Sequence, residues 1–204
     1  MADDLIYVVE DDAAMRRSIV FLAESVGWPV RDFASAEDFL AQAEPERASC
    51  LILDIRMPTM SGLELQQELN RRKFALPVVF ITGHGDVAMA VQAMKLGAQD
   101  FIEKPFKDQQ LLDAIAQAVR VSASRRVRDR RQAEVRLLFN RLTAREREVA
   151  HLVARGLSNK LIARELDISD KTVGVHRTHV LEKLDVHSAA QLAQLLMAMG
   201  QGAD

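Results

Sequence analysis

One short segment, residues 51–58, restricts the fold more than any other part of this sequence. It reads Leu-Ile-Leu-Asp-Ile-Arg-Met-Pro, so three apolar residues precede a single aspartate, Asp54. Such a run fits a strand that is buried on both faces, and Pro58 disfavours its continuation. We therefore expect Asp54 at the carboxyl end of a central strand, where open parallel sheets bind ligands. Aspartates also commonly cap turns at such places, so this residue alone does not define a site.

Apolar runs and helical patterns alternate along the first half of the chain. The runs suit short strands, and the segments between them carry apolar residues at the three- and four-residue spacing of a helix. The expected strands cover residues 5–9, 30–33, 51–54, 77–81 and 100–103. This alternation predicts an α/β fold with a doubly wound, five-stranded parallel sheet.

Polar residues gather where these expected strands end. They are Glu10, Asp11 and Asp12 after the first strand, Asp54 on the third, Thr82 after the fourth and Lys104 after the fifth. Because the carboxyl ends of parallel strands share one edge, we expect these side chains to converge. Close carboxylates repel one another and favour a cation, and their oxygens suit Mg²⁺. A carboxylate beside a cation, a lysine and a hydroxyl can attack a phosphoryl donor. The alternative is a set of loop-capping acids and a surface lysine.

Composition indicates a soluble cytoplasmic protein with two differently charged halves. The only cysteine, Cys50, excludes an internal disulfide, and the sequence has neither a signal peptide pattern nor an apolar run long enough to span a membrane. Residues 1–124 carry 12 Lys and Arg against 19 Asp and Glu, a net charge of -7. Residues 125–204 carry 15 against 10, a net charge of +5. The second half is therefore expected to bind a polyanion.

The segment between the halves is predicted to be one stiff helix. No Gly or Pro occurs between Pro105 and Gly156, and helical spacing continues from residue 109 onward. Residues 125–131 read Arg-Arg-Val-Arg-Asp-Arg-Arg. We interpret these arginines as a solvated helix surface, with phosphate contact as the alternative. Pairing of two such helices as a short coiled coil is a further alternative.

The last part of the chain has a helix-turn-helix pattern. Thr143 and Glu146 form a capping box, and Ser158 and Asn159 are expected to cap a second short helix. After a tight turn, Ser169 caps a helix that carries Lys171 and Thr172 near its start. A polar helix start of this kind can enter a major groove and meet phosphate. A plain helical bundle with a basic face is the alternative.

The strand-end residues of the first half resemble the receiver domain of two-component response regulators. The motifs are Glu10-Asp11, Asp54 with Met57-Pro58, Thr82-Gly83 and Lys104-Pro105. The resemblance implies that Asp54 is the phosphoacceptor and that Thr82 and Lys104 contact the phosphoryl group. It places Mg²⁺ on Glu10, Asp11, Asp54 and the main-chain carbonyl of Arg56. It also implies that Phe101 moves with Thr82 as an aromatic switch, and that the bond before Pro105 is cis. Glu10 departs from the family, which more often has aspartate there.

The second half resembles the four-helix LuxR/NarL-type DNA-binding domain. The motifs are Leu142-Thr143-x-Arg145-Glu146, residues 156–163 and Lys171-Thr172-Val173-x-Val175-His176. Together the halves resemble the FixJ branch of response regulators. The resemblance and the helix-turn-helix pattern assign DNA contacts to Lys160, Ser169, Lys171, Thr172, Gly174, Val175, Arg177 and Thr178. Gly174 departs from relatives that carry a long polar residue there, and we hypothesise that it makes base reading shallow.

The resemblance implies a transcription regulator that is not a turnover enzyme. A sensor histidine kinase would phosphorylate Asp54, and a homodimer would bind DNA at a two-fold site. The expected divisions are a receiver at 1–122, a helical linker at 123–140 and a DNA-binding domain at 141–204. The expected dimer face comprises helix 86–97, strand 100–103 and the start of the next helix, including Lys95 and Asp100. The rival interpretations are a Mg²⁺-dependent phosphohydrolase and a regulator that works without phosphorylation.

Overall fold

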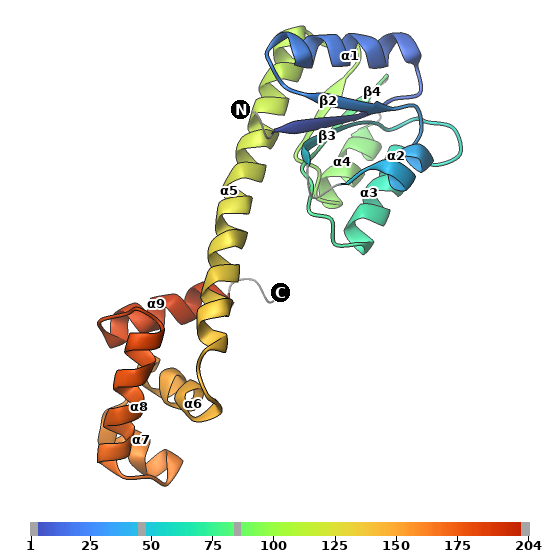
Figure 1. Ribbon diagram of the computed structural model, residues 1–204. Coiled ribbons are helices and arrows are strands. Elements are labelled where there is room, and N and C mark those ends of the chain that lie inside the picture. The colour runs from blue at the N-terminus through green and yellow to red at the C-terminus, as the bar shows by residue number, and fades with distance from the viewer. Residues whose placement is uncertain (1–3, 45–47, 84–86, 201–204) are drawn as a thin grey trace. The chain divides into compact units, whose positions relative to one another are not determined.

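The computed structural model describes residues 4–44, 48–83 and 87–200. It divides the chain into two compact units, Met1–Arg125 and Arg126–Asp204. The first unit alternates strands and helices, coloured blue to green in Figure 1. They are β1 (Leu5–Val9), α1 (Ala13–Ser25), β2 (Val30–Phe33), α2 (Ala36–Gln42), β3 (Ala48–Asp54), α3 (Gly62–Arg71), β4 (Val78–Thr82), α4 (Val87–Lys95) and β5 (Asp100–Glu103). None of the helices in the described part of the chain combines the length and apolar character needed to cross a membrane.

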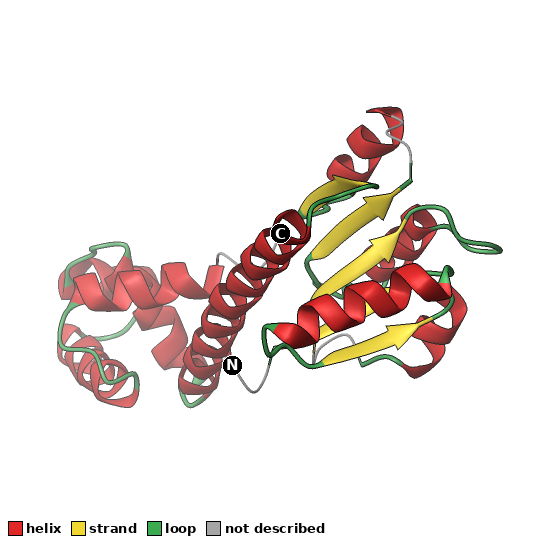
Figure 2. Ribbon diagram, turned by 90° about the horizontal axis from the view of Figure 1, so that it is seen from above, coloured by secondary structure: helices red, strands yellow, loops and turns green. Residues whose placement is uncertain are grey.

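The five strands form one parallel sheet in the order β2-β1-β3-β4-β5. Helices lie on both of its faces (Figure 2), which confirms the predicted doubly wound fold. β3 has neighbours on both sides, and all seven of its residues are buried. It starts at Ala48 and not at Leu51 as the sequence predicted, because residues 48–50 are buried too and pair with β1.

Each face of the sheet has its own apolar core, because successive strand residues point to opposite faces. Tyr7 and Val9 of β1 pack with residues of α2, α3 and α4. Ile6 and Val8 pack with residues of α1 and α5 on the other face. Full burial of one such side chain stabilises the fold by about 1.5–3 kcal/mol. The two cores therefore hold β1 and β3 side by side, and with them the residues at their carboxyl ends.

A single helix, α5 (Asp108–Asn140), continues from the first unit into the second. This confirms the predicted long helix, which no Gly or Pro interrupts. In the second unit α5 is followed by α6 (Ala144–Ala154), α7 (Asn159–Leu166), α8 (Asp170–Lys183) and α9 (Ala189–Gly200). Phe139, near the end of α5, belongs to the apolar core that these four helices share. The second unit is therefore all-α, as predicted.

Polar caps begin several helices where the sequence predicted them. Thr143 and Glu146 form the capping box of α6, and the hydroxyl of Ser169 accepts a hydrogen bond from the Thr172 amide at the start of α8. Ser158 is the N-cap residue of α7, as predicted, but its side chain makes no capping hydrogen bond within the described residues. Its main-chain carbonyl accepts hydrogen bonds from the Leu161 and Ile162 amides.

Gly62, the first residue of α3, lies close to the main chain of Asp54 and Ile55. Its amide donates to the Ile55 carbonyl at 3.0 Å. A Cβ atom at Gly62 would lie 2.1 Å from the carbonyl oxygen of Asp54. No side chain fits at that distance without displacing the end of β3 and the residue it carries.

Replacement of Gly62 by alanine is therefore expected to destabilise the first unit by about 1–3 kcal/mol, the usual cost of overpacking. Urea unfolding followed by the fluorescence of Trp28, the only tryptophan, measures this loss. Gly83→Ala is the matched control, because a Cβ there meets nothing within 4 Å in the part of the chain that the structure describes. Equal stability of the two variants would show that the loop yields freely at Gly62.

Candidate functional site

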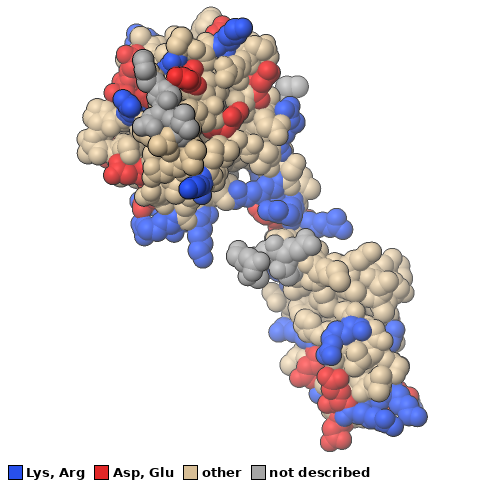
Figure 3. All heavy atoms as spheres, turned by 180° about the vertical axis from the view of Figure 1, so that it is seen from behind, with Lys and Arg blue, Asp and Glu red and all other residues tan. Residues whose placement is uncertain are grey.

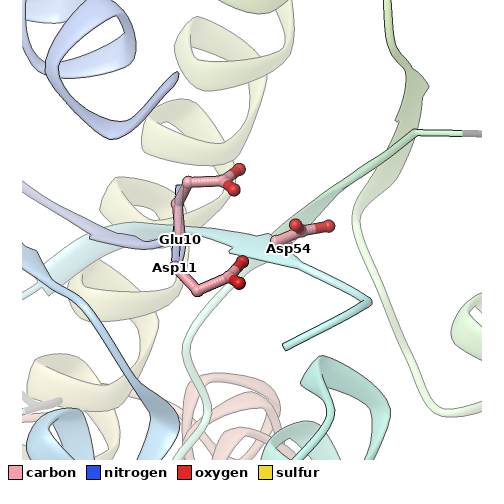
Figure 4. Close-up of side chains that lie close together, drawn as sticks. All are labelled: Glu10, Asp11 and Asp54. Carbon is pink, nitrogen blue, oxygen red and sulfur yellow. The ribbon is translucent and has the colours of Figure 1, made fainter. Parts of the chain in front are cut away.

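Three carboxylates meet at the carboxyl edge of the sheet. Glu10 and Asp11 follow β1, Asp54 ends β3, and one oxygen of each lies within 4.8 Å of the others. Figure 4 shows Glu10 and Asp11 leaving the end of β1 beside Asp54. Glu10 and Asp54 are buried, whereas Asp11 is exposed. The cluster is thus buried at two carboxylates and has an open side at Asp11. It offers only carboxylate oxygens, which suit a hard divalent cation.

A positive charge, Lys104, reaches the cluster from the end of β5. Its Nζ atom donates to Glu10 Oε2 at 2.6 Å and to Asp54 Oδ2 at 3.2 Å. Burial opposes the charge on Lys104, but the hydrogen bond to Glu10 and the charge of Asp54 outweigh it and raise the pKa of Lys104. Burial also raises the pKa of Glu10, and the hydrogen bond from Lys104 opposes that rise. Lys104 thus neutralises part of the charge that the fold brings together. Its bond to Pro105 is cis, as the resemblance implied.

Thr82 ends the strand next to β3 and adds a hydroxyl to this edge. Its neighbour Ile81 is the register partner of Asp54. Thr82 is fully buried, and its Oγ1 atom has no hydrogen-bond partner in the described residues. Because a buried hydroxyl without a partner is costly, this group is suited to donate a hydrogen bond to an oxygen of a ligand. On the next strand Phe101 is half-buried and packs against the edge of the core shared with α3 and α4.

Two main-chain amides donate hydrogen bonds to carboxylates of the site, whereas one acid, Asp12, is not part of it. The Arg56 amide donates to Asp54 Oδ1 at 3.3 Å. Asp12, which the sequence grouped with Glu10 and Asp11, instead caps α1 by accepting from the amides of Ala14 and Met15. The Asp12 amide in turn donates to Glu10 Oε1 at 3.3 Å. A sequence pattern identifies acids near a strand end, but it does not separate a cap from a site residue.

The predicted DNA-contacting residues lie on α7 and α8 of the second unit. Asp167, in the left-handed conformation at the end of α7, makes the tight turn between these helices. Lys160, Ser169, Lys171, Thr172, Val175 and Thr178 are exposed, and Gly174 and Arg177 are half-buried. Figure 3 shows basic side chains gathered at the end of this unit, beside a group of acidic ones. This surface presents polar and basic groups at the start of a helix, which is the arrangement that binds phosphate and enters a major groove.

Internal contacts distinguish some of these residues from the others. Arg177 Nη1 donates to Asn159 Oδ1 on α7 at 3.1 Å, so this arginine joins the two helices. Thr178 Oγ1 donates to the Gly174 carbonyl at 3.1 Å. A Cβ at Gly174 would meet only Asn159 Nδ2 at 3.9 Å, an ordinary contact. The glycine is therefore not required by packing within this unit.

A buried carboxylate, Glu146, joins the start of α6 to the end of α8. Its side chain is 4% exposed and accepts two hydrogen bonds from Lys183 Nζ, each at 2.7 Å. It also accepts from the Thr143 amide at 2.8 Å. Burial opposes the charge on Glu146, but the bonds from Lys183 and Thr143 outweigh it and lower its pKa to about 2.

The first unit has the geometry of a phosphoryl-accepting signalling domain, and the second has that of a helix-turn-helix DNA-binding domain. Residues 6–116 match the response regulator receiver domain, and residues 140–196 match the luxR family of bacterial regulatory proteins. The chain therefore belongs to the response regulators of two-component systems that carry a LuxR-type DNA-binding domain. Proteins of this family regulate transcription and are not turnover enzymes, which excludes the phosphohydrolase interpretation.

Relatives match along nearly the whole chain. Nodulation protein W of Bradyrhizobium diazoefficiens is 46% identical over 98% of this chain and 88% of that protein. The transcriptional regulatory protein FixJ of Rhizobium meliloti is 44% identical over 99% of both. Among solved structures, response regulator StyR is 46% identical, with a TM-score of 0.84 over 96% of this chain and 98% of StyR. Full-length FixJ from B. japonicum is 40% identical, with a TM-score of 0.58 over 97% and 98%. The predicted FixJ-type architecture is confirmed.

Glu146 makes the stability of the second unit depend on pH. Its pKa is about 2 in the folded chain against an ordinary 4.5, so folding favours the charged form. Its contribution is complete above about pH 4.5 and is lost as the pH falls toward about 2. Scanning calorimetry should show this loss as a lower transition temperature of the second unit. Trp28 lies in the first unit, so its fluorescence does not report this transition. Glu146→Gln removes the titrating group and should therefore reduce the change in the transition temperature of that unit across this pH range. An unchanged pH dependence in Glu146→Gln would contradict the assignment.

Proposed function

We propose that Asp54 accepts a phosphoryl group from a sensor histidine kinase and that this event controls DNA binding by the second unit. The observation that carries the proposal is the meeting of Asp54 with Glu10, Asp11 and Lys104 at one sheet edge. These residues come from the ends of β1, β3 and β5, far apart in the chain. Family membership supports both the kinase and the DNA as partners.

The chemistry is an in-line transfer to a carboxylate. A carboxylate oxygen of Asp54 attacks phosphorus, the bond from phosphorus to the donor nitrogen of the kinase histidine breaks, and an acyl phosphate forms. Lys104 already contacts Asp54 at 3.2 Å, so its ammonium group can pair with an oxygen of the transferred group. The Thr82 hydroxyl, which has no hydrogen-bond partner among the described residues, can donate to another such oxygen. Each contact is stronger to the phosphorylated aspartate than to the free one, which favours the product.

The acidic cluster fits Mg²⁺. Its oxygens lie close enough to share one cation, and its open side leaves room for the waters that Mg²⁺ retains. Glu10, Asp11, Asp54 and the Arg56 carbonyl are the proposed ligands. When bound, the ion would neutralise charge on the transferred phosphoryl oxygens. Glu10 and Asp54 are also the acceptors of Lys104 in this structure, so the lysine and the cation share these two carboxylates.

Phosphorylation is proposed to act through Thr82 and Phe101 on the face of α4 and β5. Movement of Thr82 toward the phosphoryl group vacates space that the half-buried ring of Phe101 can fill. Two apolar side chains of α4, Val91 and Met94, are 47% and 51% exposed. With the exposed charges Lys95 and Asp100 they form a self-complementary face for a homodimer. Residue 86, the predicted start of this face, lies outside the described residues.

The dimer is proposed to place two α8 helices on a two-fold DNA site. The exposed residues Lys160, Ser169, Lys171, Thr172, Val175 and Thr178, with Gly174 and Arg177, make the proposed contacts. The proposed functional divisions are 1–122, 123–140 and 141–204, and the boundary between compact units at Arg125 and Arg126 falls inside the linker. A protein with these partners is proposed to act in the cytoplasm.

Asp54→Asn is expected to abolish phosphorylation by acetyl phosphate and Mg²⁺, because an amide is not a nucleophile for phosphorus. Intact-protein mass spectrometry should show one added phosphoryl group on the wild type and none on the variant. Asp38→Asn, at an exposed position of α2, is the matched control and should be phosphorylated normally. Phosphoryl transfer to Asp54→Asn would place the acceptor elsewhere.

Lys95→Glu is expected to weaken the phosphorylated dimer at least tenfold, because it places like charges against Asp100 across a two-fold face. Sedimentation velocity on the phosphorylated proteins measures the dimer fraction. Arg17→Glu on α1 makes the same charge change at an exposed site and serves as the control. A Lys95→Glu dimer as stable as that of the control would exclude this face.

A further inference from the structure

Arg16 of α1 contacts the main chain beneath the acidic cluster, although it is not one of the residues assigned above. Its Nη1 atom donates to the Glu10 carbonyl at 2.6 Å and to the Asp11 carbonyl at 3.3 Å. Its Nε atom donates to Asp32 Oδ2 on β2 at 3.0 Å. The Arg16 side chain is only 17% exposed. One largely buried guanidinium therefore ties together α1, the end of β2 and the loop that carries Glu10 and Asp11.

These contacts lie just beyond the end of β1, where main-chain hydrogen bonding to β2 ends. The Glu10 amide still donates to the Phe33 carbonyl at 3.2 Å, as the last bond between β1 and β2. Arg16 bonds the next two carbonyl groups, those of Glu10 and Asp11. Because the orientation of a peptide group sets the directions in which the neighbouring Cα–Cβ bonds leave the chain, a fixed carbonyl pair limits where the two carboxylates can point. The planar guanidinium suits this task, since its donors hold several acceptors in one geometry.

We propose that Arg16 is a positioning residue that aims the carboxylates of Glu10 and Asp11 at the Mg²⁺ site. This inference rests on the proposed metal site and adds a residue that orients two of its proposed ligands. Loss of a partner that orients metal ligands typically weakens metal binding by about 10- to 100-fold. Arg16→Met keeps most of the apolar stem but removes the charge and all three hydrogen bonds.

Electrostatics alone gives the opposite sign, so the test is decisive. Removal of a positive charge near three carboxylates strengthens the attraction for a cation. Arg17→Met removes the same charge from the next, exposed position of α1 and is the matched control. If Arg16 acts only as a charge, both variants bind the cation as tightly as the wild type or more tightly. If Arg16 positions the ligands, Arg16→Met alone binds it more weakly.

The experiment is a titration of the full-length chain with Mn²⁺, which takes the same oxygen ligands as Mg²⁺. Electron paramagnetic resonance of the free ion counts the unbound metal. The expected result is Mn²⁺ binding about 10- to 100-fold weaker in Arg16→Met and unchanged or slightly tighter in Arg17→Met. Trp28 fluorescence establishes that each variant is folded at the titration temperature. A folded Arg16→Met that binds Mn²⁺ like the wild type would overturn the inference, even if its stability were lower.

A second variant keeps the test informative if Arg16→Met fails to fold. Arg16→Lys retains the charge, but one ammonium group cannot hold both carbonyls and Asp32 in the same geometry. We expect binding weaker than wild type, and wild-type affinity in Arg16→Lys would contradict a role for the guanidinium. Absence of Mn²⁺ binding to the wild type would instead contradict the metal site itself, so the two failures are distinct.

Discussion

Glu10, Asp11 and Asp54 bring like charges within 4.8 Å of one another. The structure around them offsets the repulsion between these charges. The two apolar cores fix β1 beside β3, so the carboxylates cannot separate without disturbing buried packing. Lys104 supplies the opposing charge from the end of β5, which lies two strands away from β3 in the sheet. Charge that the fold assembles and only partly neutralises is suited to bind a cation and then a phosphoryl group, which is the activity proposed for this receiver.

The remaining parts of the molecule provide the proposed connection between this edge and DNA. Thr82 lies on β4 and Phe101 on β5, and Phe101 packs against the core that includes Ala93 of α4. These are the residues proposed to carry a change at Asp54 to the proposed dimer face. α5 carries the chain into the second unit without a break. There Glu146 and Lys183 hold the start of α6 to the end of α8, so the helix proposed to contact DNA is fixed to the helix that follows α5.

The sequence predicted the sheet, the long helix and the residues at the strand ends because these follow from periodicity and from the geometry of parallel strands. It did not identify the roles of Arg16, Gly62 or Asp12. Arg16 contacts main-chain carbonyls, and Asp12 caps α1. Gly62 matters because a Cβ atom there would lie 2.1 Å from the carbonyl oxygen of Asp54. Such contacts depend on how loops meet in three dimensions, and no spacing pattern records them. The start of β3 was missed because small and polar residues, Ala48 and Ser49, begin a fully buried strand.

Phosphorylation of Asp54 is proposed to control DNA binding. The decisive measurement is the affinity of the 204-residue wild type and of Asp54→Asn for a two-fold DNA site selected from random sequence, measured by fluorescence anisotropy at one fixed salt concentration. Both proteins are compared with and without acetyl phosphate and Mg²⁺. The account predicts that the phosphodonor raises the affinity of the wild type at least tenfold and leaves Asp54→Asn unchanged. Equal, donor-independent affinity of the two proteins would contradict it and would favour a regulator that works without phosphorylation.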